Sequence, residues 1–160
     1  MSLESVRAWL AVQAPDLRLI EVEDTTATVD TAAKALGVEP GRIAKTLAVR
    51  AGDHLFLVVA RGDARLDNRK CKDEFRARPR MLGPDETLEL TGHPVGGVCP
   101  FGLKYSLPVY LDVSLKAFGS VYPAGGSTNT SVEVPVERLY ELVADRWIDL
   151  CVLREEAAGG

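Results

Sequence analysis

The sequence predicts an α+β fold built on a mixed, curved β-sheet. Segments typical of strands and of helices follow one another without the regular strand–helix–strand alternation of a doubly wound fold. The composition, with 46% hydrophobic and 26% charged residues, is that of an ordinary folded protein. The 160 residues contain no internal repeat, low-complexity segment or linker, so we expect one domain over residues 1–160.

The N-terminal part predicts a helix, a strand and a second helix. Apolar residues recur at helical spacing over residues 2–13, and Pro15 follows them. Residues 17–23 alternate between apolar and polar side chains, which favours a short strand. Thr28 has a side chain suited to cap a helix that runs to Leu36, just before a glycine.

The next segment predicts a pair of strands. Residues 39–45 indicate a short turn or helix that leads into them. The apolar stretch 46–67 then predicts two strands around a turn at Gly52 and Asp53, with another turn at residues 61–63.

Two further helices are expected between residues 68 and 92. Asp67 can cap a helix from Asn68 to about Phe75. Residues 83–92 begin as a turn and continue as a helix, although residues 88–91 also fit an extended strand.

The C-terminal part is mostly strand. Residues 135–144 predict a helix with a proline in its first turn, and residues 155–160 are expected to be a frayed tail. The strands expected here are residues 107–115, 119–127, 131–135 and 147–153.

Several classes of protein are excluded by what the sequence lacks. No apolar run approaches the roughly 18 residues of a membrane span, and the N-terminus mixes charges with apolar residues, unlike a signal peptide. The three cysteines, Cys71, Cys99 and Cys151, have the spacing of neither a metal site nor a disulfide framework. We therefore expect a reducing, cytoplasmic location, no metal and no cofactor.

Basic residues concentrate in one segment of an otherwise acidic chain. Residues 61–80 carry a net charge of +4, whereas the whole chain carries −4. This pattern suits a polyanion held in one place, and it also suits a solvated helix face with no partner. The basic residues are Arg61, Arg65, Arg69, Lys70, Lys72, Arg76, Arg78 and Arg80.

The candidate reactive side chains are few. Lys45 stands next to an apolar strand, where its ammonium group would either reach solvent or offer a charge to a phosphate or carbonyl oxygen. Cys99 would be a nucleophile if His93 were its base, or simply a small buried side chain. His54 and His93 alone support neither a metal site nor a serine triad.

Two glycine-rich stretches, residues 91–102 and 122–130, each adjoin an expected strand. They are either plain surface loops or loops that present backbone N–H groups to a ligand. Backbone donors stabilise an oxyanion without a catalytic side chain, which would explain why no obvious nucleophile is present.

Five segments in this order resemble the YbaK/EbsC family of aminoacyl-tRNA deacylases, which is related to the editing insertion of bacterial prolyl-tRNA synthetase. The resemblance covers roughly residues 20–150, and it places the core of the domain at about 20–152. The segments are T-x-x-x-A-A (Thr28 to Ala33), the lysine of IAKTL (Lys45), ARGDARLDNRK (Ala60 to Lys70), G-G-V-x-P-F-G (Gly96 to Gly102) and AGGS (Ala124 to Ser127).

The resemblance implies a partly closed, barrel-like sheet surrounded by helices, and a hydrolase that edits in trans. Its substrate would be the ester of a tRNA carrying a small amino acid (Cys, Ala, Ser or Thr), with tRNA-Pro as a candidate tRNA. Lys45, Gly96 and Gly97 would act in catalysis, without a metal or a covalent intermediate. The expected substrate-binding residues are Thr28, Thr46, Val98, Cys99, Pro100, Gly125, Gly126 and Ser127.

The basic segment then gains a partner in the acceptor end of the aminoacyl-tRNA. Prolyl-tRNA synthetase is a candidate second partner. The residues expected to contact tRNA phosphates are Arg61, Arg65, Arg69, Lys70 and Lys72.

Two departures from the family pattern leave the subfamily open. The chain has Cys99 where YbaK-type members usually have serine, and Gly126-Ser127-Thr128 where a basic residue usually follows the late glycine. Two other functions remain: a binding module of the same fold that holds aminoacyl-tRNA or the synthetase without hydrolysis, and a small cysteine hydrolase that uses Cys99.

Overall fold

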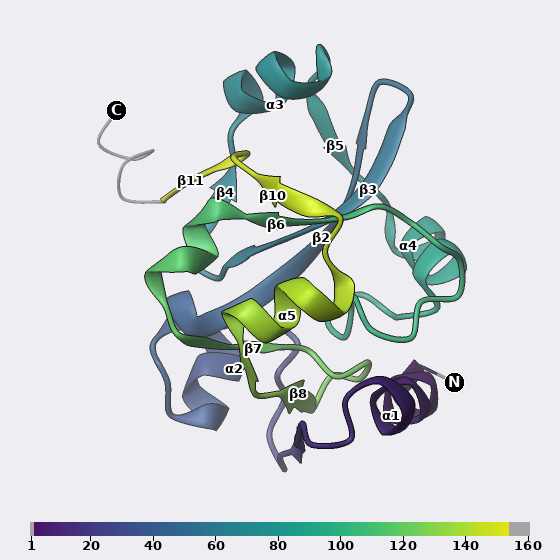
Figure 1. Ribbon diagram of the computed structural model, residues 1–160, viewed down its shortest axis with the longest axis vertical. Coiled ribbons are helices and arrows are strands. Elements are labelled where there is room, and N and C mark those ends of the chain that lie inside the picture. Colours follow the sequence, from purple (N-terminus) through teal and green to yellow (C-terminus); the bar gives the residue numbers. More distant parts are fainter. Residues whose placement is uncertain (1, 154–160) are drawn as a thin grey trace.

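A mixed, seven-stranded sheet curls into half of a barrel, with helices packed around it (Figure 1). The structure is a computed structural model that describes residues 2–153. The strand order is β10-β6-β3-β2-β7-β9, and β5 pairs with β2 beside β7. Parallel pairs (β2 with β7, β3 with β6, β6 with β10) and antiparallel pairs (β2 with β3, β2 with β5, β7 with β9) occur together. The predicted α+β class with a partly closed, mixed sheet is confirmed.

The elements have the following bounds. The helices are α1 (Ser2–Gln13), α2 (Val29–Leu36), α3 (Asn68–Phe75), α4 (Pro84–Thr91) and α5 (Val136–Val143), with short 3-10 helices η1 (Pro40–Arg42) and η2 (Val113–Ala117). The strands of the large sheet are β2 (Ile43–Ala51), β3 (His54–Arg61), β5 (Pro79–Met81), β6 (Val109–Asp112), β7 (Ser120–Pro123), β9 (Val134–Pro135) and β10 (Arg146–Ile148). Two separate pairs are β1 (Leu19–Glu21) with β8 (Thr130–Val132), and β4 (Ala64–Leu66) with β11 (Cys151–Leu153).

Both faces of the β2–β3 hairpin are buried, which explains its nearly continuous apolar sequence. On one face, Leu57 and Val59 pack with Val6 of α1 and Leu139 of α5. On the other face, Phe56 and Val58 pack with Cys71 of α3. In Figure 1, α3 accordingly lies at the opposite end of the molecule from α1.

The helix ends follow the local signals in the sequence. Thr28 caps α2 by accepting from the Thr31 N–H, and Gly37 ends this helix in the left-handed conformation. Asp67 caps α3 by accepting from the Lys70 N–H. The helix expected within residues 83–92 is α4, and it includes residues 88–91, for which a strand was also open.

Pairing between distant segments changes several expected strands. The expected strand 147–153 is two strands, because the chain turns where Leu150 N–H donates to the buried Asp112 carboxylate at 2.8 Å. The expected strand 131–135 is likewise divided between β8 and β9. Residues 43–45 belong to β2 and not to a turn or helix, and β5 was not expected.

Two expectations stay as predictions. The frayed tail at residues 155–160 lies outside the described residues, and one domain over residues 1–160 remains a prediction. In the described part of the chain, every helix is too short or too polar to cross a bilayer.

Candidate active site

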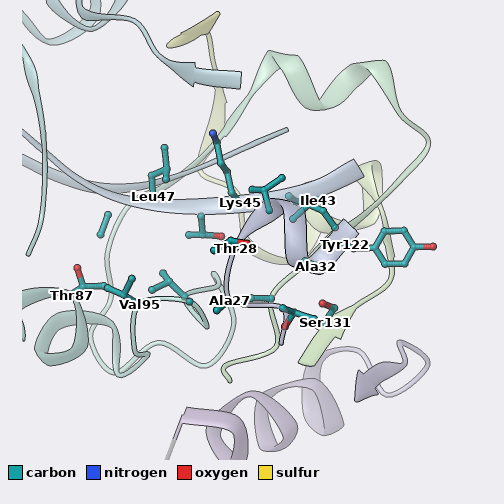
Figure 2. A pocket seen from close by; sticks show the side chains of 18 of the residues that line it. Ala27, Thr28, Ala32, Ile43, Lys45, Leu47, Thr87, Val95, Tyr122 and Ser131 are labelled. Atoms are coloured by element: carbon teal, nitrogen blue, oxygen red, sulfur yellow. The ribbon is translucent and has the colours of Figure 1, made fainter. Parts of the chain in front are cut away.

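A cavity of about 440 Å³ lies beside β2, and we call it the apolar cavity. It is enclosed by the segment before α2, by α2 itself, by the start of α4 and by the first glycine-rich stretch (Figure 2). Small and aliphatic side chains form most of its wall. They are Ala27, Val29, Ala32, Ile43, Ala44, Leu47, Ala48, Met81, Leu82, Val95, Val98 and Ala124.

The cavity coincides with a gap in the sheet. One edge of β2 pairs with β7 at residues 43–44 and with β5 at residues 49–51, and within residues 2–153 no strand pairs with the stretch between them. The Ala48 carbonyl accepts from Leu82 N–H across this edge at 3.0 Å. Because backbone groups alternate along a strand, the N–H and C=O of Thr46 point to the same edge. A ligand in the cavity therefore meets backbone hydrogen-bonding groups of β2.

Lys45 lies on β2 at the border of this cavity. Its amine points to the other side of the β2 ribbon from Ala27 and Val95 (Figure 2). The side chain is half-buried, and its amine donates to the Ala64 carbonyl. Lys45 thus belongs to the wall of the apolar cavity while its charge lies on the opposite face of the strand.

That charge faces a second cavity of about 650 Å³, which we call the charged cavity. Arg61 and Asp63 form an ion pair in its wall, with distances of 2.5 Å from Nε to Oδ1 and 2.8 Å from Nη2 to Oδ2. The Arg61 hydrogen bonds hold the pKa of Asp63 below its usual range. The residues that line this cavity are Thr28, Val29, Asp30, Pro40, Lys45, Arg61, Gly62, Asp63 and Leu153. Lys45, Thr28 and Val29 are common to both cavities.

The two glycine-rich stretches pack directly on each other. A Cβ on Gly97 would lie 2.8 Å from the Ser127 backbone nitrogen, so only glycine allows this approach. Gly96 has a φ of 96° and lines the apolar cavity, where its Cβ would meet Ala27 at 3.1 Å. Close packing between loops therefore accounts for glycine at position 97, and a special conformation at the cavity for glycine at position 96.

Several backbone donors of these stretches are already used. Gly97 N–H donates to the Pro94 carbonyl at 2.9 Å, and Gly125 N–H donates to the Thr130 carbonyl at 3.0 Å. The Ser127 hydroxyl contacts Thr130 Oγ1 at 2.7 Å. These groups stabilise the loops through contacts within the chain, so they are not free to bind a ligand.

The expected catalytic and substrate-binding residues consequently divide into two groups. Thr28, Thr46 and Val98 line the apolar cavity together with Lys45 and Gly96. The others lie outside its lining, and they are Gly97, Cys99, Pro100, Gly125, Gly126 and Ser127.

Cys99 is part of the core. It is fully buried, its thiol donates to the Phe101 carbonyl at 3.8 Å, and its sulfur lies 3.6 Å from His93 Nε2. Burial raises the pKa of the Cys99 thiol to about 12. It also lowers the pKa of His93, so the pair lacks the exposed thiolate that a nucleophilic cysteine needs.

Two residues of this region were missed by sequence reasoning. Ser2 Oγ contacts His93 Nδ1 at 2.6 Å and the Gly126 carbonyl at 2.5 Å, which fastens the start of α1 to both glycine-rich stretches. Thr26 lines the apolar cavity and is 6% exposed. Neither position carries a motif, because its role arises only from tertiary contacts.

The five residues expected to contact tRNA lie on β3, β4 and α3. Arg65, Arg69 and Lys72 are exposed. Arg61 pairs with Asp63, and Lys70 pairs with Asp149 at 2.9 Å, which raises the pKa of Lys70. The three exposed residues are therefore best placed to meet a polyanion.

Comparison with known proteins identifies the family. A model of the aminoacyl-tRNA editing domain matches residues 23–142. YwhH of Bacillus subtilis, an uncharacterized protein, is 48% identical over 153 residues, covering 94% of this chain and 98% of YwhH. EbsC of Enterococcus faecalis, named as a candidate Cys-tRNA(Pro)/Cys-tRNA(Cys) deacylase, is 29% identical over 126 residues, covering 77% of this chain and 76% of EbsC.

A solved structure agrees with the sequence relatives. The crystal structure of a candidate trans-editing enzyme for prolyl-tRNA synthetase superimposes with a TM-score of 0.85 and 32% identity. The match covers 93% of this chain and 96% of that one. The chain belongs to the aminoacyl-tRNA editing domain family.

Proposed function

We propose that this protein is a trans-editing hydrolase that cleaves the ester of a tRNA charged with a small amino acid. The ester carbonyl would be attacked by water, the bond to the ribose oxygen would break, and free amino acid and tRNA would leave. We propose no covalent intermediate on Cys99, because its thiol is buried and its pKa is raised.

One observation carries the proposal: an apolar cavity opens at the unpaired stretch of β2, directly beside Lys45. Its about 440 Å³ and aliphatic wall suit a small acyl group with little polar surface. The backbone N–H of Thr46 at this position is held by β2 before the substrate arrives. Preorganised donors of this kind stabilise the oxyanion that forms in ester hydrolysis.

The charged cavity suits the nucleotide end of the same substrate. Lys45 and Arg61 line it together with Asp30 and Asp63, so the cavity carries charges of both signs. It shares Lys45, Thr28 and Val29 with the apolar cavity. An aminoacyl-adenosine could therefore lie across the edge of β2, with the acyl group in one cavity and the phosphate side in the other. Lys45 would hold the substrate at the junction of the two.

The exposed basic residues extend this surface toward a longer nucleic acid. Arg65, Arg69 and Lys72 would contact phosphates of the acceptor end, an interaction that weakens with salt. A solved relative is named as a candidate trans-editing enzyme for prolyl-tRNA synthetase. We accordingly propose tRNA-Pro as the first tRNA to test, the synthetase as a candidate partner, and the cytoplasm as the place of action.

The test is deacylation of tRNA-Pro charged separately with Ala, Ser, Thr, Cys and Pro, with wild type compared to Lys45→Ala. We expect multiple turnovers on one or more small esters and little on the prolyl ester. Lys45→Ala should lower kcat/KM by about a hundredfold or more, the size of effect seen when one stabilising group is removed. Its melting temperature should fall only modestly, because the variant loses the hydrogen bond from the Lys45 amine to the Ala64 carbonyl but no apolar packing of the core.

The outcomes separate the competing functions. Salt-sensitive tRNA binding with no hydrolysis of any ester would support the binding module and refute the enzyme. Full activity of Lys45→Ala would refute the assigned site while leaving the activity in place.

A further inference from the structure

Two buried hydroxyl groups in the described part of the chain have no hydrogen-bond partner, Thr26 Oγ1 and Thr46 Oγ1. Both residues line the apolar cavity. Among residues 2–153 these two are the complete set of buried side-chain nitrogen and oxygen atoms without a partner. Their coincidence at one cavity, in a chain that otherwise pairs such groups, points to a ligand that supplies the missing bonds.

Neighbouring threonines show that pairing is available nearby. The Thr25 hydroxyl donates to the Thr128 carbonyl at 3.2 Å, and the hydroxyls of Thr28 and Thr31 lie 2.8 Å apart. The Thr87 hydroxyl, which also belongs to the cavity lining, has the Leu82 carbonyl at 3.5 Å. The unpartnered hydroxyl of Thr26 is therefore not a general property of this region.

The backbone prevents Thr26 from finding another partner. Its N–H donates to the Thr128 carbonyl at 2.6 Å, which fixes the residue against the second glycine-rich stretch. Only 6% of the residue is exposed. Within the described residues the hydroxyl therefore has no partner, and a group that enters the cavity would supply one if the side chain turned toward it.

An apolar acyl group would leave both hydroxyls without a partner. Displacing ordered water by a group that cannot reproduce its hydrogen bonds loses affinity. A side chain with a hydroxyl restores them, and a site built to hydrogen-bond such a group rejects the analogue that lacks it far better than a purely apolar site could. The cavity wall is otherwise mostly aliphatic, with further hydroxyl groups on Thr28, Thr87, Tyr122 and Ser131. Among the hydroxyls of the lining, those of Thr26 and Thr46 are the buried ones that lack a partner in the described part of the chain.

We propose that Thr26, together with Thr46, recognises the side-chain hydroxyl of the acyl group, so that the preferred substrates are seryl and threonyl esters. The proposal rests on the proposed function of this site as an ester hydrolase. It makes Thr26 a specificity-determining residue, in a segment where no motif was recognised.

The test uses a pair of acyl groups with nearly the same shape. Seryl and 2-aminobutyryl esters of the same tRNA differ by a hydroxyl in place of a methyl group. Single-turnover rates with wild type should favour the seryl ester by about tenfold or more. Thr26→Val should reduce this ratio to within about threefold of one, by slowing the seryl ester without slowing the 2-aminobutyryl ester.

Matched variants separate hydrogen bonding from packing. Thr26→Ser keeps the hydroxyl and should keep the ratio, and Thr46→Val should lower it. Thr25→Val removes a hydroxyl that is already paired and lies outside the cavity lining, and it should leave the ratio unchanged. If Thr26→Val does not fold, as judged by its thermal transition, the wild-type ratio, Thr26→Ser and Thr46→Val decide the question.

Failures of the two proposals are distinguishable. Hydrolysis with a wild-type ratio near one, or a ratio that survives both Thr26→Val and Thr46→Val, overturns the role of Thr26 and leaves the hydrolase in place. No hydrolysis of any ester overturns the hydrolase, and the proposal on Thr26 falls with it.

Discussion

The two cavities that share Lys45 are built in different ways. The wall of the apolar cavity combines segments far apart in the sequence, from the residue before α2 to the glycine-rich stretches, held by close backbone contacts. The charged cavity also combines distant segments, but it is lined by charged side chains of α2, of β2 and of the turn after β3, where Arg61 and Asp63 pair across two residues. The first has a shape fixed by packing, whereas the second has a charge set by side chains on the surface.

This difference suggests that the two regions recognise different parts of the substrate. A cavity fixed by packing can measure the size of an acyl group, because it cannot relax without moving a loop. A polar surface tolerates variation in what it holds and contributes affinity that depends on salt. Changes on one side should therefore alter selectivity, and changes on the other should alter tRNA binding.

The largest expected effect comes from breaking the contact between the glycine-rich stretches. In Gly97→Ala the new methyl group would lie 2.8 Å from the Ser127 nitrogen and 2.9 Å from the Gly126 carbonyl carbon, so the loops must separate. Overpacking of this kind costs about 1–3 kcal/mol in the free energy of unfolding. We expect a lower melting temperature by differential scanning calorimetry and a loss of about a hundredfold in deacylation, since small displacements are costly in catalysis.

Gly119→Ala is the matched control for this prediction. No atom lies within 4 Å of the position its methyl group would take, and its φ is not in the left-handed region. It should leave both measurements unchanged. Equal stability of Gly97→Ala and wild type would mean that the loop contact is not the constraint described above.

A smaller effect is expected from filling the apolar cavity. Ala27 lines the cavity but is exposed, so Ala27→Leu should occupy space without disturbing the core. We expect about a tenfold loss of activity for the threonyl ester and a smaller loss for the alanyl ester, because one or two methylene groups have effects of this size in binding pockets.

Kinetics across esters of increasing size measure this trend. Ala117→Leu, an equal enlargement at an exposed residue outside the cavity lining, should change nothing. A uniform loss for all esters in Ala27→Leu would show that the cavity does not hold the acyl group.

The exposed basic residues, which line neither cavity, should respond differently to substitution. Replacing Arg65, Arg69 and Lys72 together by alanine removes exposed charges and should weaken tRNA binding several-fold at low salt. The slope of log affinity against log salt should fall by about 0.7–0.9 for each phosphate that the variant no longer neutralises. Selectivity among acyl groups should remain that of wild type.

Binding titrations over a range of salt concentrations test this expectation. Arg18→Ala, an exposed arginine outside the basic segment, provides the control. An unchanged salt slope in the triple variant would assign tRNA binding to a different surface.

The smallest effect is expected at the cysteines. Burial raises the pKa of Cys99 to about 12 and that of Cys71 to about 11, and it also raises the pKa of Cys151. Each thiol stays protonated at pH 8, since this pH lies below its raised pKa. The native protein should therefore react slowly with a thiol reagent. The denatured protein should react with three equivalents of the reagent, one for each free cysteine.

Cys99→Ser should keep activity within about twofold of wild type, with no change in the pH–rate profile between pH 7 and 9. A large loss of rate in Cys99→Ser at unchanged stability would instead support the alternative function, a hydrolase that uses Cys99 as its nucleophile.

The features that could be predicted from the sequence are those with local causes. The caps at Thr28 and Asp67 depend on residues within one turn of the chain, and both were found. Strand β5 and the corner at Leu150 were missed, because they depend on β2 and on Asp112, which lie far away in the sequence. Long-range pairing leaves little trace in a short segment.

The site shows the same limit. Lys45 and Gly96 were identified from motifs, and both line the apolar cavity. Gly97 and Gly126 were expected to contact substrate, yet their surroundings are those of loops packed on each other and on α1. A glycine motif does not reveal whether the close neighbour is a ligand or another part of the chain. The unpartnered hydroxyl of Thr26 could be recognised only after the cavity was known.

The hydrogen bond from the Ser2 hydroxyl to the Gly126 carbonyl has a consequence for folding. It joins residues 124 positions apart, and the Thr26–Thr128 contact joins residues 102 positions apart. Contacts of such long range form slowly, because closing a large loop costs entropy before the contact can compensate for it. We expect the hairpin of β2 and β3 to form early and the apolar cavity to form late, so that a newly made chain would acquire secondary structure before it could bind its substrate.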